Sequence, residues 1–394
     1  MRIIYFLPDV EAGVARIVKN IINNRPAEST VQYAVVLFRA VDNKSQPVIN
    51  NFYDAEVFKV EYDHQENIFA TFRRLKKCIY TETDIIVAND GFELRMAVAL
   101  KIKNPIVYII HGDFDYYYHV ISLNQKILNL IITYSTAIDN KIRKLLPQRS
   151  DLVQKIYYPA LAQPLPITRR KRVSSAPFRI LFAGTLNERK GANLLYDIFM
   201  QLLALDLKNF ELKIMGEGEL YQSLLSSFST HAAVTITGWQ PAEVILKAMT
   251  EADVFLFPSN AEGLPNVLIE ALSAGAVPVA SNLKSGVADV ITDKVNGILV
   301  QPLCRENFAN AIFELYKNPA QLTYLRSNSG IGLERFDLSA QAAGYEKAIL
   351  QAGKQNDIRE RIFPSYSMGR VLNKNSIPNF IVKFLRKIIR HPQF

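Results

Sequence analysis

Short apolar runs alternate with amphipathic stretches along almost the whole chain, and this alternation restricts the fold more than any other feature. The apolar runs are typical of buried strands, and the stretches between them have the spacing of helices that bury one face. Strands that alternate with helices build parallel sheets from βαβ units. Because a chain of 394 residues exceeds one ordinary core, two Rossmann-like domains are expected.

The alternation predicts individual elements in both halves. In the first half, strands are predicted at 3–7, 33–38, 84–88, 106–110 and 131–134, and helices at 14–24, 66–80, 94–101 and 137–146. In the second half, strands are predicted at 179–183, 211–215, 234–237, 254–257, 277–280 and 298–300. Prolines and a basic cluster mark a linker at 159–177. The domains are therefore expected at 1–165 and 166–354, followed by a basic tail at 355–394.

Positive charge is concentrated in the tail. The net charge is +9, and residues 355–394 hold eight basic and two acidic side chains, which is two thirds of that excess. A nucleic-acid binder would spread basic residues over a domain face, so no nucleic-acid partner is expected. A basic tail on a near-neutral body points to an anionic membrane surface.

Residues 377–390 have helical spacing, with apolar side chains on one stripe and basic side chains on the other side. The stripe consists of Ile377, Phe380, Ile381, Phe384, Leu385 and Ile388. The segment is shorter than the roughly 18 apolar residues of a membrane span, but it suits the surface of an anionic bilayer. Packing of the stripe on the first domain is the alternative. Two isolated cysteines, Cys78 and Cys304, indicate a cytoplasmic protein, with peripheral association at the inner face of the plasma membrane as a further expectation.

The segment 260–275 carries the strongest functional signal. It follows a strand, and its helix is expected to open near Pro265 and to stop at Gly275. The first N–H groups of such a helix lack partners and attract phosphate. Glu262 lies in the loop before the helix and Glu270 lies inside it. Two carboxylates beside a phosphate site would accept hydrogen bonds from neutral hydroxyls, which indicates a sugar on one side of a diphosphate and a ribose on the other.

The same residues resemble the Glu-x7-Glu signature of retaining GT-B glycosyltransferases, glycosyltransferase family 4 in particular. The surrounding Pro-Ser-x-x-Glu-Gly-Leu-Pro-Asn and Glu-Ala-Leu-x-x-Gly carry the resemblance, together with the segments 275–281, 285–289 and 296–297. It covers roughly residues 2–350. The resemblance implies an α/β fold with two Rossmann-like domains, the first on the acceptor side and the second binding the nucleotide-sugar.

The resemblance also implies roles for single residues. Lys190 would neutralise the diphosphate. Thr185 stands where the family usually has a second cation, an arginine, and Arg189 is the candidate to replace that arginine. His111 would lie beside the donor sugar, and Glu262 and Glu270 would hold sugar and ribose hydroxyls. The remaining expected donor contacts are Gly13, Gly216, Gly238, Leu264, Pro265, Asn266 and Val267, and Arg16 is the expected acceptor contact. The family's usual glutamate at position 15 is replaced by Ala15, so its acceptor contacts are not carried over.

The expected activity is transfer of a hexose-type sugar from a UDP- or GDP-sugar to a hydroxyl acceptor with retention of configuration. The acceptor would be a glycan or lipid-linked glycan in cell-surface polysaccharide or lipopolysaccharide synthesis. No metal or other cofactor is expected, because a helix end and cations stabilise the leaving diphosphate. A metal role for Asp113 and Asp115 is therefore rejected. A nucleotide-sugar epimerase of the same fold and a non-catalytic sugar-binding relative remain as alternatives.

Overall fold

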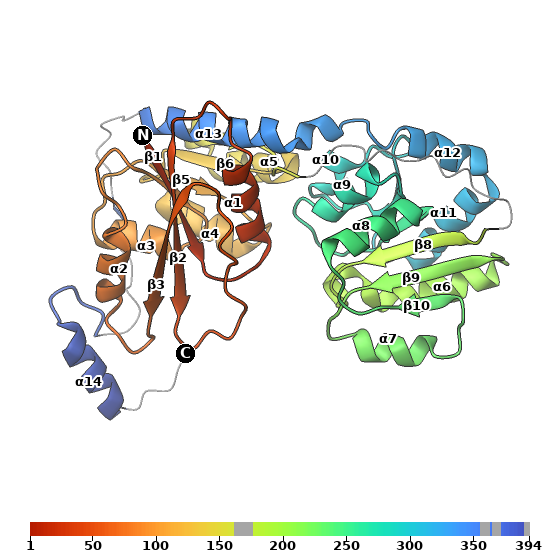
Figure 1. Cartoon of the computed structure of the whole chain (residues 1–394), viewed down its shortest axis with the longest axis horizontal. Coiled ribbons are helices and arrows are strands. Elements are labelled where there is room, and N and C mark those ends of the chain that lie inside the picture. Colours follow the sequence, from red (N-terminus) through yellow and green to blue (C-terminus); the bar gives the residue numbers. More distant parts are fainter. Residues whose placement is uncertain (161–175, 355–362, 365–371, 390–394) are drawn as a thin grey trace. The chain divides into compact units, whose positions relative to one another are not determined.

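The computed structural model describes residues 1–160, 176–354, 363–364 and 372–389. The chain divides into two compact units, which Figure 1 shows in ribbon form. The first unit comprises Met1–Tyr134, Asp139–Pro159 and Leu338–Phe394, and the second comprises Ser135–Ile138 and Ala160–Asp337.

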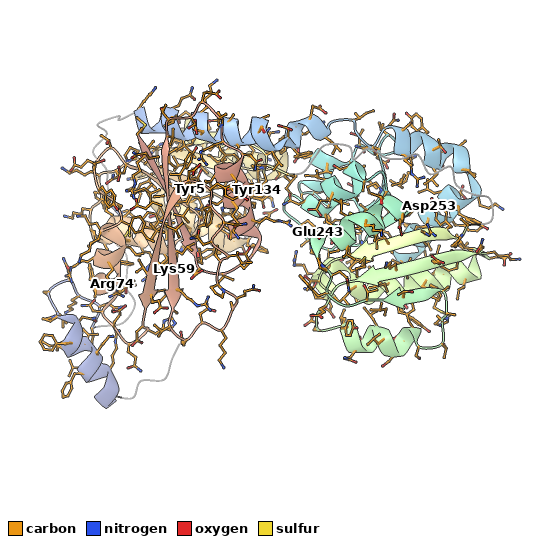
Figure 2. All side chains as sticks on the ribbon, viewed as in Figure 1. Tyr5, Lys59, Arg74, Tyr134, Glu243 and Asp253 are labelled. Carbon is orange, nitrogen blue, oxygen red and sulfur yellow. The ribbon has the colours of Figure 1, made fainter. Side chains whose placement is uncertain are left out.

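The first unit is built on a seven-stranded parallel sheet in the order β3-β2-β1-β4-β5-β6-β7. The strands are β1 (Arg2–Pro8), β2 (Gln32–Ala40), β3 (Ala55–Tyr62), β4 (Ile85–Ala88), β5 (Ile106–Ile109), β6 (Leu130–Thr133) and β7 (Val153–Lys155). The central strands are apolar and fully buried, as helices on both faces of a parallel sheet require. Figure 2 shows two side chains of this interior, Tyr5 on β1 and Tyr134 directly after β6. The strand order reverses direction between β1 and β4, so their carboxyl ends form the place where such sheets bind ligands.

Seven helices are described in or next to this sheet: α1 (Gly13–Asn23), α2 (Ile68–Lys76), α3 (Phe92–Ala99), α4 (Asp115–Asn124), α5 (Thr136–Leu145), α13 (Leu338–Lys354) and α14 (Asn379–Ile389). Four of these strands and helices were not predicted, namely β3, β7, α4 and α13. β3 is an edge strand with charged residues between its apolar ones, and β7 has only three residues. In α4, three consecutive tyrosines follow the first residue and obscure the helical period.

The second domain is shorter at its C-terminal end than the sequence predicted. Residues 338–354 were expected in the second domain, but they form helix α13 and belong to the first unit. Glu346 on α13 accepts hydrogen bonds from Tyr33 on β2, at 2.5 Å, and from Ser29, at 2.7 Å. The Tyr345 hydroxyl donates to the carbonyl of Ile156 at 3.2 Å, and the tyrosine is fully buried. These long-range contacts are the reason for the correction. The predicted boundary at 165/166 lies outside the described residues.

The second unit is built on a six-stranded parallel sheet in the order β10-β9-β8-β11-β12-β13. The strands are β8 (Phe178–Ala183), β9 (Phe210–Met215), β10 (Val234–Ile236), β11 (Val254–Phe257), β12 (Val277–Ser281) and β13 (Ile298–Val300), and all six were predicted. The helices are α6 (Leu195–Ala204), α7 (Tyr221–Phe228), α8 (Ala242–Glu251), α9 (Asn266–Ser273), α10 (Val287–Val290), α11 (Arg305–Lys317) and α12 (Pro319–Ser327). The order reverses between β8 and β11. The prediction of two doubly wound α/β units is thus confirmed.

Candidate active site

The loop after β8 is pressed against the end of β11. Gly191 ends its short 3₁₀ turn (Glu188–Lys190) with a positive φ of 70°. A Cβ at this position would lie 2.1 Å from the carbonyl oxygen of Pro258, so only glycine fits without a shift. The Asn187 side chain accepts the backbone N–H of Lys190 at 2.9 Å. This packing fixes Arg189 and Lys190 beside the segment that contains Glu262.

Lys190 and Glu262 form a close ion pair. The Nζ of Lys190 lies 2.6 Å from Oε1 of Glu262, and Nη1 of Arg189 lies 3.8 Å from Oε2 of the same carboxylate. Arg189 also donates to the carbonyl of Ala261 at 3.2 Å. The Glu262 side chain is only 8% exposed, whereas that of Arg189 is 47% exposed. The structure therefore brings together three residues that the sequence assigned to the donor.

Helix α9 begins and ends where the sequence predicted. Pro265 precedes its first residue, Asn266, and Gly275 follows its last turn with a φ of 78°. The loop before the helix is held by a hydrogen bond from Gly286 N–H to the carbonyl of Gly263 at 2.8 Å. No side chain caps the N-terminus of α9 among the described residues. Its first N–H groups thus lie directly behind Glu262, and Glu270 lies in the following turn.

Several buried polar atoms along the carboxyl edge of this sheet have no hydrogen-bond partner within the described part of the chain. They are Thr237 Oγ1 after β10, Ser259 Oγ and Asn260 Oδ1 after β11, Asn266 Oδ1 at the start of α9, and Ser281 Oγ at the end of β12. Buried polar groups are nearly always satisfied by protein, water or ligand. Five such atoms at one edge indicate a site for a polar ligand. Of these residues only Asn266 was predicted, although polar residues directly after buried strands are a signal that the sequence offers.

The glycines after β9 and β10 hold these loops at close range. Gly216 has a φ of 149°, and a Cβ there would lie 1.9 Å from the carbonyl oxygen of Gly184. Its N–H donates to the carbonyl of Gly238 at 2.8 Å. Gly216 and Gly238, both predicted from the sequence, therefore join two loops by a hydrogen bond at the carboxyl edge of the sheet. Trp239 is 67% exposed, so its ring is open to a ligand.

In the first unit, His111 follows β5 and is held by two protein partners. Its Nε2 lies 2.7 Å from Oδ1 of Asn89, and its Nδ1 lies 3.1 Å from the hydroxyl of Tyr158. The Asn89 amide nitrogen donates to the carbonyls of Phe6 and Val87, so its oxygen faces His111 and Nε2 carries the proton. Burial lowers the pKa of His111 to about 3. The imidazole is therefore neutral at pH 7, with one tautomer favoured.

Asn89 is itself positioned by a buried acid. Oε1 of Glu93 on α3 accepts the backbone N–H groups of Asn89, at 2.5 Å, and Asp90, at 2.7 Å. Burial and the neighbouring Asp90 carboxylate raise the pKa of Glu93 to about 8. Glu93, Asn89 and Tyr158 were not predicted, because their link to His111 depends on contacts between distant segments.

Gly13 and Arg16 lie at the start of α1, directly after β1. The loop between them and β1 is held by Glu11, whose carboxylate accepts from Lys19 at 2.8 and 2.9 Å. A Cβ on Gly13 would meet nothing within 4 Å, so the structure gives no steric reason for glycine there. Arg16 is exposed. Both residues belong to the same carboxyl edge as His111.

The described residues contain no group of three or more His, Cys, Asp or Glu side chains that could hold a metal ion. Asp113 lies in an ion pair with Lys141, with an Oδ2–Nζ distance of 2.6 Å, and also accepts the Tyr118 hydroxyl. Asp115 is the first residue of α4.

Comparison with known proteins shows which proteins this chain resembles. Residues 177–318 match the family described as glycosyl transferases group 1. The amylovoran biosynthesis glycosyltransferase AmsK of Erwinia amylovora is 33% identical over 31% of this chain and 32% of its own length. The chain thus spans about a third of the length of the first curated relatives it matches.

Two solved structures extend the likeness to both units. Anabaena Alr3699/HepE, crystallised in complex with UDP, has a TM-score of 0.72 at 19% identity, and the match covers 89% of this chain and 100% of that one. The lipopolysaccharide outer core galactosyltransferase WaaB has a TM-score of 0.71 at 18% identity, with 89% and 99% covered. The chain has the GT-B fold. Residues 177–318 of its second unit resemble the group 1, family 4-like glycosyltransferases.

Proposed function

We propose that this protein is a retaining glycosyltransferase that moves a hexose-type sugar from a UDP- or GDP-sugar to a hydroxyl acceptor. The observation that carries the proposal is the part-buried Lys190–Glu262 pair, which precedes the uncapped start of α9 in the chain. A cation, free N–H groups and a carboxylate in one place suit a diphosphate joined to a sugar. The unpartnered polar atoms along the same edge support a polar ligand there.

In this proposal the second unit binds the donor. Lys190 and Arg189 neutralise the diphosphate. The backbone N–H groups of Leu264, Asn266 and Val267 assist them, whereas Pro265 has no N–H group and contributes only contact. Glu262 holds hydroxyls of the sugar and Glu270 those of the ribose. The loops at Gly216 and Gly238 contact the base through backbone groups.

The first unit supplies the acceptor side in this proposal. His111 and Gly13 contact the donor, and Arg16 contacts the acceptor. The bond between the sugar's anomeric carbon and the phosphate oxygen breaks while the acceptor oxygen bonds to the same face of that carbon. The acceptor proton passes to the departing phosphate oxygen, and Lys190 stabilises the negative charge that develops there.

The relatives support a narrower proposal for the acceptor. AmsK is named for amylovoran biosynthesis and WaaB for the lipopolysaccharide outer core. We infer that the acceptor is a glycan or lipid-linked glycan made for the cell surface, and that the protein works in the cytoplasm. HepE was crystallised with UDP, which favours a UDP-sugar as donor.

Thermal-shift measurements with UDP-glucose, UDP-galactose and GDP-mannose test the donor proposal first, because a bound ligand raises the melting temperature. Stabilisation by one nucleotide-sugar, lost in Lys190→Ala but kept in the exposed control Lys208→Ala, is the expected result. Slow release of nucleotide, faster with acceptor and unchanged by EDTA, would establish transfer without a metal. Interconversion of the donor sugar without an acceptor would instead identify an epimerase, and binding without any turnover a non-catalytic relative.

A further inference from the structure

Helix α14 is attached to the first unit by polar contacts at the start of α2. Asn67, which is 1% exposed, donates from its side chain to the carbonyls of Lys374, at 2.8 Å, and Ile377, at 2.7 Å. Its backbone N–H donates to Oδ1 of Asn379, the first residue of α14, at 2.8 Å. The same Asn67 side chain caps α2 by accepting from Phe69 N–H. One buried asparagine thus fixes where α14 begins.

A second set of polar contacts fixes the direction of the helix. Arg386 donates to Oδ1 of Asn373 at 2.8 Å and to the backbone carbonyls of His64 and Glu66. Glu66 also accepts from Arg74 on α2, which Figure 2 labels. Burial alone would raise the pKa of Glu66, but hydrogen bonds from Arg74 and Thr71 bring it below its usual value. These charged contacts orient α14 without using its apolar side chains.

Three of the described apolar side chains of α14 are exposed. Phe380 is 74% exposed, Phe384 63% and Ile381 36%, and we call these three residues the outward face. Val382, which the sequence did not place on the apolar stripe, is fully buried. The alternative in which the predicted stripe packs on the first domain is therefore wrong for these three positions. Figure 1 shows α14 at the periphery of the first unit.

We propose that the outward face inserts into the interfacial region of an anionic lipid bilayer. Lys374 is exposed beside the helix, and Lys383 within it is half-exposed and lies 3.8 Å from Asp63 of the first unit. The sequence adds Lys387 and Arg390 without any acidic residue in 377–390. Two exposed aromatic rings and an isoleucine in a segment whose sequence is basic match a negatively charged surface with an apolar interior. This inference stands apart from the proposed activity, because it rests on α14 alone.

The size of the outward face argues against a second copy of the chain as its occupant. A stable protein interface needs about 800 Å² from each partner, far more than three side chains supply. The helix has 11 residues and is therefore about 16 Å long, which is half a bilayer core. None of the helices in the described ranges combines the length and apolar character that crossing a bilayer requires.

Vesicle flotation of the full chain tests the proposal. The protein should float with vesicles of phosphatidylcholine and phosphatidylglycerol, much less with phosphatidylcholine alone, and less as salt is raised. Replacing both rings, in Phe380→Ser/Phe384→Ser, should weaken binding at least tenfold, since each buried ring contributes more than 1 kcal/mol. The matched control is Ile49→Ser, an exposed apolar residue elsewhere in the same unit. The double variant Lys374→Glu/Lys387→Glu should weaken binding at least about 25-fold at low salt, by about fivefold for each basic residue lost, and Lys208→Glu should not.

Three outcomes would overturn the proposal. The first is equal binding of both vesicle types, and the second is unchanged flotation of the two-serine variant. The third concerns the chain without lipid: if sedimentation shows a dimer that becomes a monomer in Phe380→Ser/Phe384→Ser, the outward face binds a second copy instead. Circular dichroism melting of each variant confirms that the unit stays folded, as expected for side chains that contact mainly solvent.

Discussion

Nε2 of His111 lies 2.7 Å from Oδ1 of Asn89, although the two residues follow different strands, β5 and β4. The His111 imidazole at the carboxyl edge of the sheet is therefore neutral and held in one orientation, so it is not available as a general acid or base. Beside the donor sugar, His111 is proposed to shape the site and to offer a polar but uncharged surface. A proton transfer through His111 would require one of its two partners to move.

Tyr158→Phe should loosen this arrangement while keeping the ring stacked on His111. The phenylalanine removes the hydroxyl that faces Nδ1 and the carbonyl of Ile110, which should cost about 1 to 3 kcal/mol of unfolding free energy. Nitrogen NMR of the imidazole should show protonated Nε2 and bare Nδ1 down to about pH 4 in the parent and in the variant alike, because Asn89 still accepts from Nε2. The exposed Tyr53→Phe is the control. An imidazolium signal near pH 6 in the parent would contradict the fixed neutral state.

Glu262→Gln and Glu270→Ala should distinguish contacts to the donor's sugar from contacts to its nucleotide. The glutamine removes the charge that pairs with Lys190, so the lysine becomes available to a diphosphate and UDP affinity should stay equal or rise. Sugar transfer should fall at least a hundredfold, because a carboxylate contact to the sugar is lost. Glu270→Ala should instead weaken UDP itself. Calorimetric titration with UDP and a transfer assay measure both effects, and near-normal turnover in both variants would refute the assignment.

Lys190→Ala should reduce donor affinity more than Arg189→Ala. A mostly buried ammonium contact to a diphosphate contributes about 1.5 to 3 kcal/mol, which is roughly a tenfold to hundredfold change in Kd. Arg189 is 47% exposed, so solvent screening reduces its share to a few-fold change. Titration of each variant with the same nucleotide-sugar ranks the two cations. The opposite ranking would make Arg189 the main phosphate contact.

Stability should fall between pH 6.5 and pH 8 because of Glu93. Its pKa is raised to about 8, so the folded state keeps a proton that the unfolded chain releases near pH 4.5. The free energy of unfolding therefore decreases with pH in this window, by up to about 2 kcal/mol. His111 acts with the opposite sign, but only below pH 6.5, because its pKa is lowered from that value. In chemical denaturation, the unfolding free energy of Glu93→Gln should change less with pH than that of the parent or of the exposed control Glu82→Gln. An equal pH dependence would rule out Glu93 as its cause.

The donor half of the site is readable from the sequence because its parts lie within short segments. Pro265 and Gly275 bracket α9, and Lys190 follows its strand by seven residues, so local patterns suffice. The environment of His111 is different, since Asn89 is 22 residues away and Tyr158 is 47 residues away along the chain. The periodicity of apolar residues in the sequence does not indicate that the Asn89 amide faces the His111 ring.

The tail shows a similar limit. Spacing predicts an amphipathic helix at 377–390, and α14 occupies Asn379–Ile389. Which side faces the protein is decided by Asn67 and Arg386, whose hydrogen bonds leave Phe380 and Phe384 exposed and bury Val382. The side chains of 387–389 and residue 390 lie outside the described set.

The position of α13 has a consequence for biosynthesis. The carboxylate that Tyr33 and Ser29 require is Glu346, more than 300 residues further along the chain. While the ribosome is still translating the second unit, β2 has its strand neighbours but lacks this acceptor, and α1 lacks the helix that packs on it. We therefore expect the second unit, whose segments 135–138 and 160–337 both precede α13 in the chain, to mature first. The N-terminal unit would then wait for almost the last segment to leave the exit tunnel, the reverse of the usual vectorial order.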